Sequence, residues 1–180
     1  MTIDKVKSLR KELHRYPELS EQETKTAQRI KQFIEEYHEA KIIENIGGNG
    51  LVAIYEFSNS GPTIVIRCEL DALPIEEANK FKHRSINKGI SHKCGHDGHM
   101  AIVAGLGFWL NDQDFKNGKV ILLFQPAEET GTGAPAVLKD NNIYFGIGYQ
   151  NHQYYLNDWW QFDINNNTWT SKKDISFTER

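Results

Sequence analysis

The chain has 180 residues, a length typical of one domain with room for a small appendage. Its 21 Lys and Arg against 24 Asp and Glu give a formal net charge of −3, so we expect no nucleic-acid partner and no anionic membrane surface. No apolar run approaches the roughly 20 residues that cross a bilayer, and the polar N-terminus lacks the apolar core of a signal peptide. Two cysteines, Cys68 and Cys94, make no disulfide framework, and we expect a cytoplasmic location.

The first forty residues predict two helices. Apolar side chains recur at helical spacing among charges, at Val6, Leu9, Leu13, Ile30, Phe33 and Ile34. The segment around Pro17 breaks the pattern, and Ser20 with Glu23 has the spacing of a capping box that would begin the second helix.

The next segments predict a strand-rich region. A glycine-rich turn at residues 47–50 precedes two β-rich runs, 51–57 and 63–68, and the polar residues 58–61 between them favour a hairpin. Residues 71–98 show little periodicity and are predicted to be a long loop.

The following residues alternate between helix and strand. Residues 96–110 are apolar nearly all round, which predicts a buried helix. Residues 119–124 predict a buried strand, and residues 134–138 a short helix. Strands separated by helices are typical of an α/β domain.

The composition changes near residue 141, where we place a domain boundary between residues 1–141 and 142–180. The second part is rich in Tyr, Trp and Asn. We expect short strands at 143–149, 159–163 and 168–171 there.

Residues 92–99 (His-Lys-Cys-Gly-His-Asp-Gly-His) and residues 125–129 (Gln-Pro-Ala-Glu-Glu) carry the side chains most suited to chemistry. Thiolate, imidazole and carboxylate bind borderline divalent metals, and a further carboxylate can accept a proton from water. His92 and His99 also suit surface or core positions, and an acidic pair also suits the first turn of a helix. Both motifs together, with Asp71 ahead of them, favour a metal site.

Five segments in order carry a family resemblance: residues 9–14 (Leu-Arg-Lys-Glu-Leu-His), 17–20 (Pro-Glu-Leu-Ser), 71–76 (Asp-Ala-Leu-Pro-Ile-Glu), 94–99 and 125–129. They resemble the N-terminal part of the M20 metallopeptidases. The similar branch is that of the amidohydrolases, which includes hippurate hydrolase-like and N-acyl-amino-acid deacetylase-like enzymes. The resemblance covers residues 1–140 and implies a partial zinc-peptidase-like α/β catalytic domain.

The resemblance also implies a chemistry and its residues. Two divalent ions (Zn, Mn, Co or Ni) would act on the amide bond of an N-acyl amino acid or similar small amide. Cys94, His96 and Glu129 would be ligands, Glu128 the general base, and Asp71 a residue that orients a ligand. At residue 69 the branch usually has Asp and this chain has Glu69, which we do not assign as a ligand.

Residues 143–180 resemble a single kelch repeat, through a glycine pair at Gly146 and Gly148 and the spaced motifs 157–163 and 167–169. An ordinary aromatic hairpin is the alternative. One repeat cannot bury its own apolar face, so we expect possible self-association through Trp159, Trp160 and Trp169.

Three functions remain open at this point. The first is a metal-dependent amidohydrolase segment. Its own turnover is expected to be low because residues 143–180 offer no counterparts to the family's later ligands. The second is a non-catalytic truncated or chimeric protein that binds metal or a protein partner. The third is a kelch-type binding module with an inert N-terminal domain.

Overall fold

The computed structural model describes residues 2–133 and, beyond them, residues 136–139, 142–146, 149–150, 154–155, 158–163 and 168–173. The chain forms two compact units, Met1–Glu129 and Thr130–Arg180. Their division falls earlier than the boundary expected near residue 141, because residues 136–139 already pair with the strand that follows them. The mixed α/β fold that the sequence predicts is confirmed.

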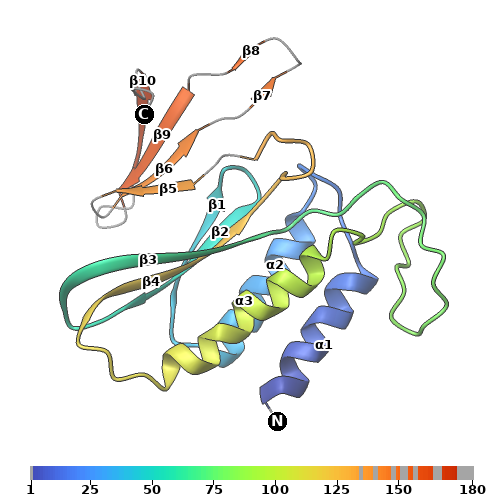
Figure 1. Ribbon diagram of the computed structural model, residues 1–180, viewed down its shortest axis with the longest axis horizontal. Coiled ribbons are helices and arrows are strands. Elements are labelled where there is room, and N and C mark those ends of the chain that lie inside the picture. The colour runs from blue at the N-terminus through green and yellow to red at the C-terminus, as the bar shows by residue number, and fades with distance from the viewer. Residues whose placement is uncertain are drawn as a thin grey trace. The chain divides into compact units, whose positions relative to one another are not determined.

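Three helices cover one face of the first unit's sheet (Figure 1). They are α1 (Thr2–Arg15), α2 (Thr24–Tyr37) and α3 (His96–Asn111). The two early helices are confirmed, and the chain leaves α1 just before Pro17, as expected for a residue that disfavours helix on its N-terminal side. Within the described part of the chain, no helix combines the length and apolar character needed to cross a membrane.

The predicted capping box is wrong. Glu23 occupies the N-cap of α2, but its side chain makes no capping hydrogen bond there. The Ser20 hydroxyl donates instead to Asp71 Oδ2 at 2.7 Å, which binds the start of α2 to the loop after β3. A free backbone N–H in the first turn of α2 is instead satisfied by a residue further upstream, because Glu18 Oε2 accepts the Thr26 N–H at 2.7 Å.

The sheet of the first unit has the strand order β1–β2–β4–β3, formed by Lys41–Ile46, Gly50–Glu56, Asn117–Gln125 and Asn59–Glu69 respectively. β1 and β2 make an antiparallel hairpin across the predicted glycine-rich turn. β3 and β4 are parallel, and α3 lies in the crossover between them. The predicted hairpin between residues 51–57 and 63–68 is wrong, because β4 pairs with both strands and separates them.

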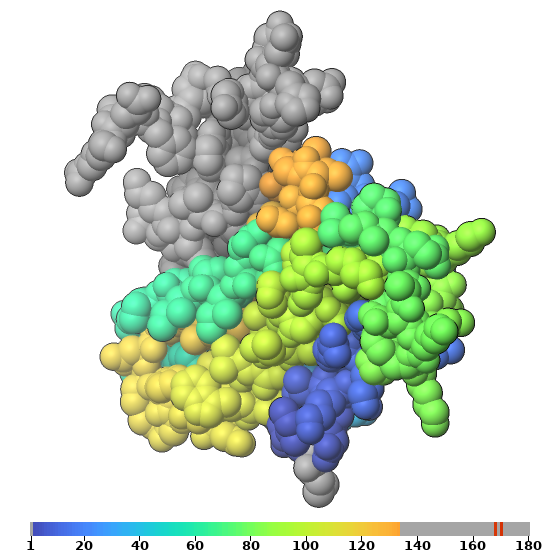
Figure 2. All heavy atoms as spheres, turned by 45° about the vertical axis from the view of Figure 1, so that its right-hand side comes forward, coloured from blue at the N-terminus to red at the C-terminus, as the bar shows by residue number. Residues whose placement is uncertain are grey.

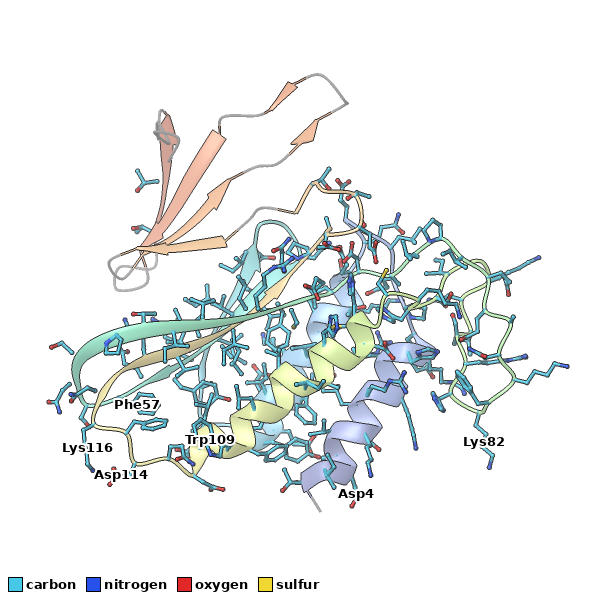
Figure 3. All side chains as sticks on the ribbon, in the orientation of Figure 1. Asp4, Phe57, Lys82, Trp109, Asp114 and Lys116 are labelled. Atoms are coloured by element: carbon cyan, nitrogen blue, oxygen red, sulfur yellow. The ribbon has the colours of Figure 1, made fainter. Side chains whose placement is uncertain are left out.

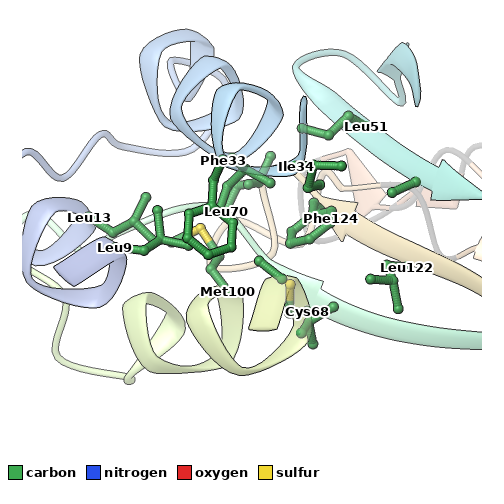
Figure 4. Close-up of a cluster of buried hydrophobic side chains, with 14 of the residues drawn as sticks. Leu9, Leu13, Phe33, Ile34, Leu51, Cys68, Leu70, Met100, Leu122 and Phe124 are labelled. Atoms are coloured by element: carbon green, nitrogen blue, oxygen red, sulfur yellow. The ribbon is translucent and has the colours of Figure 1, made fainter. Parts of the chain in front are cut away.

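The apolar core lies between this sheet and the three helices (Figure 4). Leu13 of α1, Ile34 of α2, Met100 of α3 and Phe124 of β4 are fully buried and converge there, together with Leu70 at the end of β3. Each such side chain contributes about 1.5–3 kcal/mol through removal from water. The core therefore fixes the ends of β3 and β4 against the start of α3.

Residues 70–95 connect β3 to α3 without a helix or long strand, as predicted. The segment forms a lobe beside α1 in Figure 2, and Lys82 lies at its outer end in Figure 3. Leu73 and Ser91 form a bridge across its base, and Glu77 Oε2 accepts the Ser85 N–H at 2.7 Å. These bonds give a long loop a defined path.

The described residues of the second unit beyond residue 133 form strands. They are β5 (Ala136–Lys139), β6 (Asn142–Gly146), β7 (Tyr149–Gln150), β8 (Tyr154–Tyr155), β9 (Asp158–Asp163) and β10 (Thr168–Lys173). Four of them form an antiparallel sheet in the order β10–β9–β6–β5, and β7 pairs with β8. The three predicted strands are confirmed, with the first divided into β6 and β7. The helix predicted at 134–138 is wrong from residue 136 on, because this segment pairs with β6. The side chains of Trp159, Trp160 and Trp169 lie outside the described part of the structure, so self-association through them stays a prediction.

Candidate metal centre

The predicted site residues come from three elements that end or begin at one edge of the sheet. Asp71 follows β3, His96 begins α3, and Glu128 and Glu129 follow β4. Glu69, which was not predicted as a ligand, is the last residue of β3. β3 and β4 are parallel, and the last residues of the two strands are in register. The carboxyl ends of parallel strands are the usual place for a ligand site in an α/β fold.

His96 is the centre of this group. Its side chain is buried, and its Nδ1 lies 2.8 Å from the Asp71 backbone oxygen and 3.4 Å from Asp71 Oδ1. Both neighbours are acceptors, so Nδ1 carries a proton, and Nε2 is the nitrogen that can bind a metal once it has lost its own proton. Nε2 lies 3.7 Å from Glu128 Oε2 and 3.7 Å from Glu129 Oε1. A histidine held through one nitrogen by a carbonyl or carboxylate is the usual arrangement for binding a metal through the other.

Asp71 is fully buried and joins the elements of the site. Its Oδ2 accepts the Glu129 N–H at 2.8 Å and the Ser20 hydroxyl at 2.7 Å. Burial would raise the pKa of this carboxyl, but the adjacent His96 ring and hydrogen bonds from the Glu129 N–H and Ser20 hold it below its usual range. Asp71 therefore stays ionised while it orients both His96 and the turn that carries Glu129.

The site favours positive charge. Burial alone would lower the pKa of His96, yet hydrogen bonding to Asp71 and the nearby Glu69 carboxylate raise it to about 9. The pKa of the Cys94 thiol rises to about 11 through a hydrogen bond with Glu129, some loss of hydration and the surrounding carboxylates. The surrounding carboxylates therefore favour the protonated forms of His96 and Cys94, and the same negative charge would stabilise a bound cation.

The donor set fits a divalent ion. Ligand atoms of His96, Glu128 and Glu129 all lie within 4.8 Å of one another. Glu129 Oε1 and Asp71 Oδ1 are buried without a hydrogen-bond partner, which is costly unless something else satisfies them. Imidazole with carboxylates suits zinc, manganese, cobalt and related ions.

The structure brings four of the five predicted residues together, namely Asp71, His96, Glu128 and Glu129. The fifth, Cys94, is exposed and free, and it interacts with Glu129 through its thiol. Its sulfur belongs to neither group of clustered ligand atoms among the described residues. The roles assigned to the five residues remain predictions.

Sequence reasoning missed a second group. Ligand atoms of Glu69, His96 and His99 also lie within 4.8 Å of one another. Glu69 Oε2 is 2.9 Å from His99 Nδ1 and 4.0 Å from His96 Nε2, and Arg67 Nη1 holds Glu69 Oε1 at 3.0 Å. The three-residue interval from His96 to His99 places both on one face of a helix, and this was the available signal. In both groups the nearby atom of His96 is Nε2, so His96 can bind an ion in only one of the two groups at a time.

His92 differs from these residues. It is buried, both ring nitrogens lack hydrogen-bond partners, and burial lowers its pKa to about 4. The sequence suited His92 to either a surface or a core position, and in the structure it lies in the core.

Comparison with known proteins assigns the family. The family model for peptidase family M20/M25/M40 matches residues 65–168, which include every predicted site residue. The chain belongs to this family.

Individual relatives agree with this assignment. N-acetyl-L-cysteine deacetylase of Bacillus subtilis (strain 168) is 43% identical over 136 residues, 75% of this chain and 32% of that protein. Hippurate hydrolase of Campylobacter jejuni is 36% identical over 132 residues, 73% of this chain and 34% of that protein. The crystal structure of the Bacillus subtilis YXEP protein, a dinuclear metal binding peptidase from the M20 family, superposes with a TM-score of 0.68. It is 35% identical and covers 73% of this chain and 37% of that chain.

The chain spans about a third of the length of these relatives. The family match continues into the second unit as far as residue 168, across strands whose sequence resembles a kelch repeat. The kelch resemblance of residues 142–180 therefore stays a prediction.

Proposed function

We propose that this chain supplies a metal-binding segment of an amidohydrolase that cleaves the amide bond of N-acyl amino acids or similar small amides. The observation that carries the proposal is the geometry of His96, whose Nδ1 is fixed by Asp71 while Nε2 faces Glu128 and Glu129. Family membership supports it, and so does the dinuclear metal site ascribed to the YXEP protein.

The proposed roles follow from burial and contact. His96 and Glu129 would hold an ion, with Cys94 as a third ligand once its thiol loses its proton. Bound divalent ions would polarise the amide carbonyl and lower the pKa of a water molecule. The Glu128 carboxylate is 41% exposed, which leaves it accessible to accept a proton and return it to the leaving nitrogen. Asp71 keeps His96 in the correct tautomer and orientation.

A second ion is proposed on the strength of the family, and Glu69 with His99 is the adjacent pair that could contribute to it. Arg67 restrains Glu69, so this pair keeps its position without a metal. A reducing cytoplasm is the proposed location, because it would keep Cys94 free as it is in the structure.

The substrate class rests on the relatives' names. One is named for removing the acetyl group from N-acetyl-L-cysteine and another for hydrolysing hippurate, which is itself an N-acyl amino acid. We propose the same class here, with neither the acyl group nor the amino acid specified.

Metal binding and turnover are tested separately. The purified chain is loaded with Zn²⁺, Mn²⁺, Co²⁺ or Ni²⁺ and assayed with hippurate and N-acetyl amino acids, with EDTA-treated protein as the control. EDTA-sensitive hydrolysis would support catalysis by this chain, and a chain that binds none of the four ions would contradict the proposal.

Metal binding without hydrolysis would favour the alternative, a non-catalytic protein that binds metal or a protein partner. One observation supports that alternative. The second unit forms a four-stranded antiparallel sheet, which is the form of a propeller blade such as a kelch repeat provides.

A further inference from the structure

Glu23 is a completely buried carboxylate, with 0% of its surface exposed. It occupies the N-cap of α2, where an acidic side chain ordinarily accepts a backbone N–H of its own helix. It makes no such bond. A buried carboxylate is stable only when other donors satisfy its oxygens, so its partners indicate what it holds in place.

Those partners lie far away in the sequence. Glu23 Oε1 accepts the buried Ala127 N–H at 2.7 Å, and Oε2 accepts Asn49 Nδ2 at 3.0 Å. The side chain therefore joins the start of α2 to the turn between β1 and β2 and to the turn after β4.

Ala127 has a backbone conformation that needs external support. Its φ of 51° is left-handed, which is unfavourable for a residue with a Cβ. Such a conformation persists when the surrounding contacts determine it. Ala127 directly precedes Glu128 and Glu129, so its conformation sets the direction in which both carboxylates leave the strand.

The same short turn is held at its other end by Asp71, which accepts the Glu129 N–H at 2.8 Å. Two buried carboxylates thus bracket the acidic pair, one at Ala127 and one at Glu129. The β1–β2 turn also abuts this segment, because a Cβ at Gly50 would lie 2.7 Å from Pro126 Cδ.

From these contacts we infer that Glu23 is a positioning residue for the metal centre. It holds Ala127 in the left-handed conformation that places Glu128 and Glu129 opposite His96. It touches neither the ion nor the substrate, and the inference rests on the proposed metal-binding role of Glu129.

Three substitutions of Glu23 distinguish the effect of its oxygen positions from the effect of its charge. Glu23→Gln keeps an oxygen within reach of the Ala127 N–H and removes the charge. Glu23→Asp keeps the charge and withdraws the oxygens by one methylene. Glu23→Ala removes both.

The matched control is Glu18→Ala. Glu18 also accepts a backbone N–H of α2, at Thr26, and its carboxylate accepts the Thr26 hydroxyl as well, so its described side-chain hydrogen bonds stay within α2. Its loss should lower the unfolding midpoint without changing the metal centre.

The first readout is Co²⁺ affinity together with the Co²⁺ absorption spectrum, measured on folded protein. Glu23→Ala and Glu23→Asp should weaken binding about 10–100-fold, the usual effect of removing a group that orients a ligand. Glu23→Gln and Glu18→Ala should bind with the wild-type affinity and spectrum. Equal weakening in Glu18→Ala and Glu23→Asp, or wild-type binding by Glu23→Asp, would overturn the inference. If Glu23→Ala does not fold, the Asp and Gln variants decide the matter.

The second readout needs no metal, so it remains decisive if the wild-type chain binds none and the proposed function itself fails. Amide hydrogen exchange in the metal-free protein should accelerate at both Ala127 and Glu129 in Glu23→Asp, and at neither in Glu18→Ala. Acceleration confined to Ala127 would show that Glu23 does not position the acidic pair.

Discussion

Glu128 and Glu129 are adjacent in the chain but have different surroundings. The Glu129 side chain is 16% exposed, its backbone N–H is bound by Asp71, and its Oε1 is buried without a hydrogen-bond partner. The Glu128 side chain is 41% exposed. The buried oxygen suits a ligand, whereas the exposed carboxylate suits exchange of protons with a substrate.

This contrast predicts opposite effects of two isosteric substitutions. Glu129→Gln should weaken Zn²⁺ binding by at least about 10-fold, because it removes a charged ligand. Glu128→Gln should bind Zn²⁺ as the wild type does and abolish any hydrolysis. Isothermal titration of both variants measures the difference. Loss of metal from Glu128→Gln alone would reverse the two roles.

Glu77 governs a separate, acid-sensitive contribution to stability. Its nearly buried carboxylate accepts the Ser85 N–H and contacts His14 and Lys93. Burial opposes ionisation, but these hydrogen bonds, with one from Asn79, lower its pKa from 4.5 to about 2. Because the folded-state pKa is depressed, the stabilisation is present above pH 4.5 and is lost as the pH falls toward about 2.

We expect the wild type to lose up to roughly 3 kcal/mol of unfolding free energy from this group over that range, at about 1.4 kcal/mol per unit of pKa shift. Glu77→Gln should be less stable near neutral pH, and the difference should shrink as the pH falls. Urea denaturation at a series of pH values tests this. A difference independent of pH would show that Glu77 contributes through packing alone.

At the scale of single residues, the sequence identified groups whose chemistry is local. His96 and Glu129 stand out through residue type and spacing. The role of Ser20 could not be predicted, because the partner of its hydroxyl is Asp71, fifty-one positions away. Glu69 and His99 meet only because β3 and α3 converge.

At the scale of elements, the hairpin turn at Gly50 determines how closely β2 approaches the segment after β4. A Cβ there would contact the Ile46 carbonyl oxygen and lie 2.9 Å from the Phe124 oxygen. Both are backbone atoms of paired strands, so moving them away from an added Cβ would cost free energy.

Gly50→Ala should therefore destabilise the protein by about 1–3 kcal/mol, the usual cost of overpacking. Gly98→Ala is the matched control, because a Cβ at this position in α3 meets nothing within 4 Å. It should stabilise the helix by about 0.5–1 kcal/mol. Chemical denaturation measures both. Equal stability of Gly50→Ala and the wild type would mean that the turn has room to shift.

The helices were predictable because their apolar spacing is local. The pairing of strands was not, since the polar turn at residues 58–61 favours a hairpin wherever two β-rich runs flank it. The βαβ crossover overrides that local signal, because it places β4 between β3 and β2, where β4 pairs with both. The same limit applies at residues 136–138, where pairing with β6 decides for a strand.

In the molecule as a whole, all the predicted site residues belong to the first unit, which consists of one sheet and the helices that cover it. The family was recognisable from sequence because its motifs are short, ordered and set at the ends of elements. The second unit was less predictable, since its strands gain stability from pairing that periodicity alone does not specify.

His96, with Cys94 and Glu129, is proposed to bind a divalent metal. Competitive titration of Zn²⁺ between the metal-free protein and a chromophoric chelator tests it most directly, with His96→Ala, Cys94→Ser and, as a control histidine in the long loop, His83→Ala. We predict that the first two variants lose at least about 10-fold in affinity while His83→Ala matches the wild type. Isotherms for His96→Ala and Cys94→Ser that superimpose on the wild-type isotherm would show that neither residue is a metal ligand.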